Sequence, residues 1–245
     1  MINRLCLFLI GLSFLWPGSA AALTPQEILQ IADQSRGNLA GITWTVEISS
    51  AKKKKTSAMT ISVKARGFDI ATENLAPPKY KGNKLLMLKG SMWFYKPGLS
   101  KPVPISRRQK LLGNAVYGDI AATNYAADYT ASPLPDEAIN DEPCYKFDLK
   151  SKNKKSTYNR IVYCISKERL VGVKADYYTV SGKKFKTAFM EYENTVVIDG
   201  HLKPFISSLV IYDELMSRDI TTLSLTDPGL KALPDYLFNL NLLRR

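Results

Sequence analysis

Residues that commonly carry catalysis or bind metals are few and scattered in this chain of 245 residues. Its single histidine, His201, stands in the turn-like stretch DGHLKP, a context typical of a solvated surface residue. With a single histidine and no two cysteines close together in the chain, the sequence contains no His/Cys cluster of the spacing usual for zinc sites. Neither a G-x-S-x-G nucleophile motif nor a glycine-rich phosphate-binding loop is present in the sequence.

Carboxylates are the remaining candidates for chemistry, because a pair of them can hydrolyse glycosides. Four acidic residues precede the second cysteine in a proline-flanked stretch, and nothing in their spacing selects one pair. We therefore expect no enzyme activity, no catalytic residue, no metal and no cofactor, and interpret the chain as a binding protein. The four acidic residues are Asp136, Glu137, Asp141 and Glu142.

Two of the cysteines, Cys144 and Cys164, lie in the strand-like runs CYKFDLK and TYNRIVYCI on either side of a turn-like SKNKKS. A hairpin centred near Lys154 would place them directly opposite each other, at a separation that suits a disulfide. In an exported protein such a pair is typical of a structural disulfide. A metal pair or a reactive thiol would need a nearby histidine or a second cysteine pair.

The first residues have the form of a secretory signal peptide. A short cationic start, MINR, precedes the apolar run LCLFLIGLSFLW and the small-residue stretch PGSAAA. The apolar run is too short to span a bilayer comfortably, and no lipobox follows it. We interpret residues 1–22 as a signal peptide that is cut near Ala22, and the rest as an exported protein.

The chain is strongly basic, with a formal net charge of +12. Much of the surplus stands in three lysine-rich runs: Lys52–Lys55, Lys150–Lys155 and Gly182–Lys186. Each run falls between strand-like segments, as expected of a solvated hairpin tip. Alternatively, the runs attract an anionic membrane surface. Nucleic acid is not the natural partner of an exported protein.

One helix and many short strands follow. Thr24 as N-cap, Pro25 and Glu27 predict a capped helix with an apolar stripe of Ile28, Leu29, Ile31 and Ala32. After Gly41, alternating runs separated by turn signals predict an antiparallel meander, closed or half closed into a barrel. RRQKLLG and LPDYLFNLNLL are interpreted as short helices, and residues 23–245 as one domain.

Strand alternation divides the cysteine-bearing hairpin into an aromatic face and a wet face with Lys146, Asp148 and Arg160. The run NKLLMLKGSMWFY is apolar on both faces, so both must be covered. The residues that we expect to line an apolar cavity, or otherwise to be core, are Trp93, Tyr95, Tyr145, Phe147, Ile161 and Tyr163.

The stretch KLLMLKGSMWFYKPGLSKPVPIS, the following RRQKLLGNAVYGDI and the ending LPDYLFNLNLLRR resemble the outer-membrane lipoprotein-sorting proteins of the LolA-like superfamily. GNAVYGDI is similar to a Gly-Ser-x-Phe-x-x-x-Asp-Leu segment of that family, but departs from it at Asn114 and Ala115. The cysteine pair is not among the features that carry this resemblance.

The resemblance implies an α+β, mainly β fold: a strongly curved antiparallel sheet, or incomplete barrel, with short helices as a lid over an apolar concave face. It also implies a periplasmic carrier of the acyl chains of a lipoprotein or lipid, which works without a cofactor. An inner-membrane exporter or an outer-membrane acceptor would be its partner. A sensor or adaptor of the same fold that binds a protein is the alternative.

Overall fold

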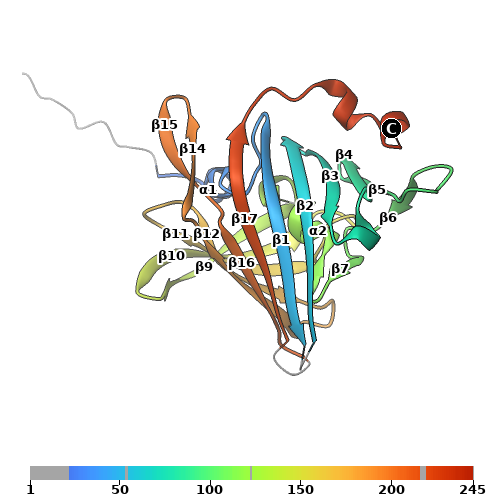
Figure 1. Ribbon diagram of the computed structural model, residues 1–245. Helices are drawn as coiled ribbons and strands as arrows, with labels where there is room; N and C mark the ends of the chain where they lie inside the picture. Colours follow the sequence, from blue (N-terminus) through green and yellow to red (C-terminus); the bar gives the residue numbers. More distant parts are fainter. Residues whose placement is uncertain (1–21, 53–54, 122, 216–218, 245) are drawn as a thin grey trace, which may run out of the picture.

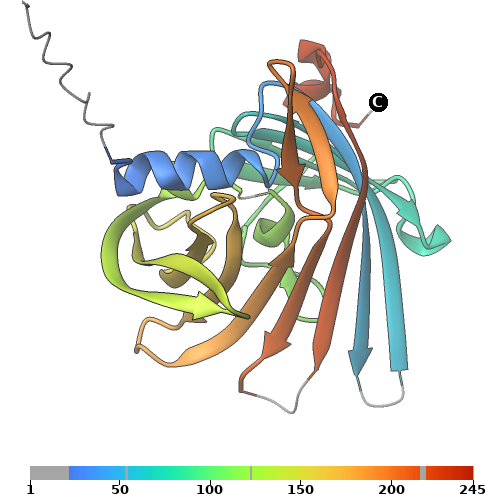
Figure 2. The same ribbon diagram turned by 90° about the vertical axis from the view of Figure 1, so that its left-hand side faces the viewer.

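The computed structural model describes residues 22–52, 55–121, 123–215 and 219–244, so the predicted signal peptide lies outside the described residues except for Ala22. Within these residues, thirteen antiparallel strands form one sheet. Its edge strands, β6 (Val103–Ile105) and β9 (Tyr129–Ile139), do not pair with each other, so the sheet is an incomplete barrel. Figures 1 and 2 show its strong curvature. The predicted fold class is confirmed.

Most neighbours in the sheet follow one another in the chain, as expected of a meander, but β1 pairs with β17 and thereby joins the two ends of the chain. The strands of the sheet are, in order from one edge to the other, β6, β5 (Ser91–Tyr95), β4 (Lys84–Leu88), β3 (Asp69–Ala76), β2 (Lys55–Arg66), β1 (Ile42–Lys52), β17 (Ile220–Leu230), β16 (Ser208–Asp213), β13 (Lys184–Glu191), β12 (Gly172–Tyr178), β11 (Arg160–Ser166), β10 (Glu142–Ser151) and β9. Two small hairpins stand apart from it: β7 (Lys110–Leu112) with β8 (Ala115–Val116), and β14 (Asn194–Ile198) with β15 (His201–Phe205).

Helix α1 (Pro25–Gln34) begins with the predicted capping box: Thr24 Oγ1 accepts from the Glu27 backbone N–H, and Glu27 Oε2 accepts from the Thr24 N–H. These bonds satisfy N–H groups that a helix start leaves without partners. The other helices are α2 (Tyr117–Ala121), α3 (Tyr125–Asp128) and the 3₁₀ helices η1 (Pro78–Tyr80), η2 (Asp235–Phe238) and η3 (Leu240–Leu242).

The two faces of the sheet are covered differently. The inner face carries the main hydrophobic core, which includes Leu85, Met87 and Met92. Alternate residues of the same strands, such as Leu86, belong to a second cluster with Phe238 and other residues of the C-terminal segment. The expectation that NKLLMLKGSMWFY is covered on both faces is thus confirmed: the barrel interior covers one face and the C-terminal segment the other.

The predicted opposite placement of the two cysteines is wrong. In the β10–β11 hairpin Cys144 stands opposite Ser166, and Cys164 stands opposite Lys146. The turn is centred on Lys155 rather than Lys154, and moving the centre by one residue moves the register by two. The cysteines therefore lie diagonally on one face, where Cα atoms are about 7–8 Å apart, a wide separation for a disulfide. Both are buried free thiols in the structure.

The predicted helix in RRQKLLG is also wrong. Arg107 and Arg108 lie in a turn, and Lys110 begins the β7–β8 hairpin. The short 3₁₀ helices η2 and η3 do lie in the C-terminal segment, as expected.

Candidate functional site

Helix α1 covers the interior of the incomplete barrel next to β9 and α3 (Figure 2). Ile28, Leu29 and Ala32 are buried in the main core. Two side-chain bonds attach the helix to one residue of α3: Gln26 Nε2 donates to the Ala126 carbonyl over 2.8 Å, and Asp33 Oδ2 accepts from the Ala126 N–H over 2.8 Å. A short helix with few polar attachments is thus the cover of this interior.

Four of the six predicted cavity residues do face the interior. Phe147, Ile161 and Tyr163 are buried in the main core, and Tyr145 packs against it half-buried. Tyr163 stacks edge-on against Tyr125 of α3, with ring centroids 5.2 Å apart. The alternation predicted for this hairpin is therefore correct, and these four residues lie beneath the lid helices.

The other two, Trp93 and Tyr95, lie on the opposite face. They are half-buried against the second cluster, which contains Phe238 of the C-terminal segment. Arg66 fixes that segment by an ion pair with Asp235 and by stacking 4.4 Å from the Phe238 ring. Trp93 and Tyr95 are thus wall residues of the outside of the sheet, not of its interior.

The interior is filled almost completely by its own side chains. It contains a small cavity of about 20 Å³ between the turn after α1, α2 and the inner sheet face, which is room for a single water molecule. Arg36, Trp44 and Asp119 form its polar part, and the remainder is mainly aliphatic. Arg36 Nη1 and Trp44 Nε1 are buried without a hydrogen-bond partner among the described residues. This cavity is therefore far too small for a lipid-sized ligand in the structure as it stands.

Buried charges stand beside this apolar interior. Lys186 Nζ lies 2.7 Å from Asp119 Oδ2, and Tyr158 donates to Asp119 Oδ1 over 2.6 Å. Burial lowers the pKa of Lys186, while the neighbouring carboxylate opposes this shift. Lys186 belongs to the run Gly182–Lys186 that we interpreted as a solvated turn, and this assignment fails for Lys186. Asp119 belongs to the segment GNAVYGDI. This segment was the only sequence signal that pointed to the Lys186–Asp119–Tyr158 cluster.

Asp33 is a second buried charge, on the inner side of α1. Burial raises its pKa to about 7, although the Ala126 N–H and Arg36 favour the charged form. Its Oδ1 has no hydrogen-bond partner among the described residues. The attachment of the cover therefore contains a carboxyl group that titrates near neutral pH.

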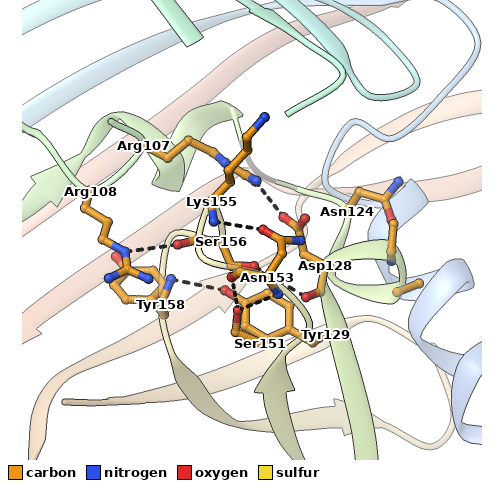
Figure 3. Close-up of polar contacts among 12 residues, drawn as sticks. Arg107, Arg108, Asn124, Asp128, Tyr129, Ser151, Asn153, Lys155, Ser156 and Tyr158 are labelled. Atoms are coloured by element: carbon orange, nitrogen blue, oxygen red, sulfur yellow. Dashed lines mark hydrogen bonds and ion pairs between the residues drawn. The ribbon is translucent and has the colours of Figure 1, made fainter. Parts of the chain in front are cut away.

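The gap between the two edges of the sheet is bridged by a set of contacts that we call the seam (Figure 3). Arg107, which follows β6, donates through Nη1 to Asp128 Oδ2 over 2.6 Å, and Asp128 precedes β9. Their side chains are only 3% and 5% exposed. Arg108 Nε donates to the Ser156 carbonyl in the β10–β11 turn over 3.0 Å. Arg107 and Arg108 of RRQK thus hold the barrel edges together.

Together, the fold and the interior define a lidded incomplete barrel. Among the described residues, no group of three or more His, Cys, Asp and Glu side chains could hold a metal ion. Within the same residues, no helix is long and apolar enough to cross a membrane.

Comparison with solved structures identifies the family. A LolA superfamily protein from Nitrosomonas europaea is 30% identical to this chain, with 89% of this chain and 98% of the other covered and a TM-score of 0.79. A domain from Vibrio parahaemolyticus, described as an outer membrane lipoprotein-sorting protein, is 19% identical over 89% of this chain and 98% of its own, with a TM-score of 0.74. A DUF1329 family protein from Desulfovibrio piger is 19% identical over 89% of this chain and 97% of its own, with a TM-score of 0.75.

The chain belongs to the LolA superfamily. A protein-family model described only as "uncharacterized protein" matches residues 69–245. No curated protein matches the chain.

Proposed function

We propose that this protein is an exported periplasmic carrier that binds the acyl chains of a lipid or lipoprotein in the barrel interior. The observation that carries the proposal is an apolar interior covered by one short helix, α1, with few polar attachments. Superfamily membership supports it. The carrier works by burial alone, without covalent chemistry or a cofactor, and no residue acts as a catalyst.

Binding begins with displacement of α1, because the interior cavity of about 20 Å³ cannot hold an acyl chain. Exposing Ile28 and Leu29 costs about 1.5–3 kcal/mol for each side chain. An acyl chain of about sixteen carbons gains about 0.8 kcal/mol per buried methylene. The gain exceeds the opening cost severalfold, so lipid uptake can drive the movement. Tyr145, Phe147, Ile161 and Tyr163 then contact the chain.

The carrier delivers its cargo to an outer-membrane acceptor or receives it from an inner-membrane exporter. The basic surface, formed in part by exposed lysines around the β10–β11 turn, attracts it to anionic membrane lipid. Residues 23–245 function as one domain, and residues 1–22 are removed after export.

A fluorescent fatty acid tests the proposal. The purified, delipidated protein should bind it and enhance its emission, and Phe147→Leu should change the affinity without unfolding the chain. Glu168→Gln, on an exposed turn, is the matched control and should leave binding unchanged. Well-folded protein that binds no fatty acid would contradict the proposal.

A further inference from the structure

A second pocket lies on the outer surface at the seam, and its two lysines belong to the basic surface that the carrier proposal assigns to membrane attraction. Its volume is about 350 Å³, within the range of small-molecule sites. It lies between the start of β5, the segment after β6 and the β10–β11 turn. We propose that this pocket binds the phosphate group of an anionic amphiphile such as a phospholipid.

The charge of the pocket supports this assignment, because each of its charged lining residues is a cation: Arg107, Lys154 and Lys155. Arg107 is 4% exposed, and its Nη1 bonds to Asp128 while its Nε has no hydrogen-bond partner in the part of the chain that the structure describes. A buried donor without a partner is unfavourable. An oxyanion in the pocket would supply hydrogen-bond acceptors to Arg107 and to the two lysines.

The turn that carries the two lysines is held in place before any ligand arrives. Asn153 Oδ1 accepts from the Lys155 backbone N–H over 2.8 Å, and Ser151 Oγ accepts from the Asn153 N–H over 3.3 Å (Figure 3). Lys155 Nζ donates to Ser91 Oγ on β5 over 3.0 Å. Because these bonds fix the turn against the opposite edge of the sheet, little ordering remains to be done on binding.

The donors fit phosphate and the walls fit an amphiphile. Arg107, Lys154, Lys155, Ser91 and Ser106 are among the lining residues, and phosphate oxygens accept hydrogen bonds from guanidinium, ammonium and hydroxyl groups. Trp93, together with neighbouring aliphatic side chains, forms an apolar wall beside them. Such a wall contacts the glycerol and alkyl part of a lipid, which free phosphate lacks.

The pocket lies on the outside of the sheet, where Trp93 belongs to the outer cluster and the lysines lie on a surface turn. Met92 and Ile105, which also line the pocket, belong to or pack against the main core, so the test variant replaces only the two lysines. Loss of phosphate binding would therefore leave fatty-acid uptake intact, and failure of the carrier proposal would leave this pocket untouched.

Calorimetric titration of the purified chain tests the site with three probes: dihexanoyl phosphatidylglycerol below its micellar concentration, inorganic phosphate, and dihexanoylglycerol, which has no phosphate. The test variant is Lys154→Gln/Lys155→Gln, because replacing Arg107 would leave Asp128 buried and unpaired and could unfold the chain. The charge-matched control is Lys81→Gln/Lys203→Gln, whose two lysines are exposed and do not line the pocket.

We expect phosphatidylglycerol to bind, dihexanoylglycerol not to bind, and the test variant to lose about tenfold in affinity, as for two exposed charge contacts of modest strength. The control variant should stay within about twofold of the wild type. Inorganic phosphate binding as tightly as the lipid would support the phosphate site but assign it to free phosphate. Equal binding of phosphatidylglycerol by the test variant and the wild type, or no binding of either phosphate probe, would overturn the proposal.

Discussion

The docking of α1 should weaken as the pH rises, because of Asp33. This carboxyl group is buried against α3, and burial raises its pKa from the ordinary 3.8 to about 7. Arg36 lowers that pKa and Asp128 raises it, but burial is the largest influence. Protonation removes the cost of burying a negative charge, and it therefore favours the docked helix.

The sign and size of the effect follow from linkage. A carboxyl group with a raised pKa in the docked state stabilises docking fully below its ordinary pKa, and this contribution is lost as the pH rises through about 7. Between pH 5 and pH 8 the loss is about 2–3 kcal/mol, if the undocked helix exposes the group to water. Asp33→Asn keeps an acceptor for the Ala126 N–H but does not titrate, so docking in this variant should not show this loss.

Hydrogen exchange of the amides in the second half of α1 measures the docking. Taking the ratio of wild-type to Asp33→Asn exchange rates at each pH cancels the intrinsic pH dependence of exchange. We expect this ratio to rise by about 30- to 100-fold from pH 5 to pH 8, which corresponds to the free energy above. A ratio independent of pH would refute the assignment of Asp33 as the titrating attachment of the cover.

Three further results are expected. Lys186→Met should lower the free energy of unfolding in urea by about 3–5 kcal/mol, because it leaves Asp119 buried without its cation; a loss below about 1 kcal/mol would contradict the buried pair. Trp93→Ala should lower the free energy of unfolding by about 1–3 kcal/mol but leave the fatty-acid affinity unchanged, since Trp93 packs outside the interior. A folded variant with reduced fatty-acid affinity would contradict this placement of Trp93. Cys144 and Cys164 should resist thiol reagents in the native protein and react with them after denaturation. Both are buried, and burial raises the pKa of Cys164 to about 11. Thiols that stay unreactive in denaturant would indicate the disulfide predicted from the sequence.

Local features of the fold could be predicted from the sequence because neighbouring residues determine them. The capping box of α1 needs only Thr24 and Glu27, three residues apart. The common face of Phe147 and Ile161 follows from strand alternation once the hairpin is recognised. The curved sheet itself was predicted from the family resemblance rather than from residue spacing.

Features that depend on distant pairing could not be predicted. Which face of a strand is concave is set by the closure of β1 against β17 and by where the C-terminal segment packs, so Trp93 and Tyr95 were assigned to the wrong side. Lys186 in a lysine-rich run resembled its solvated neighbours, since its partner Asp119 lies far away in the chain. The cysteine register depended on a single residue in the turn.

The central claim is that the interior beneath α1 holds acyl chains. The most direct measurement is mass spectrometry of an organic extract from protein purified without detergent from the compartment to which it is exported. We predict an acyl-containing lipid or lipopeptide in a near-stoichiometric amount, reduced in a variant with a larger side chain in the interior, such as Ala175→Phe. Folded wild-type protein that releases no acyl chain, and instead copurifies with a stoichiometric protein partner, would contradict the carrier and favour an adaptor.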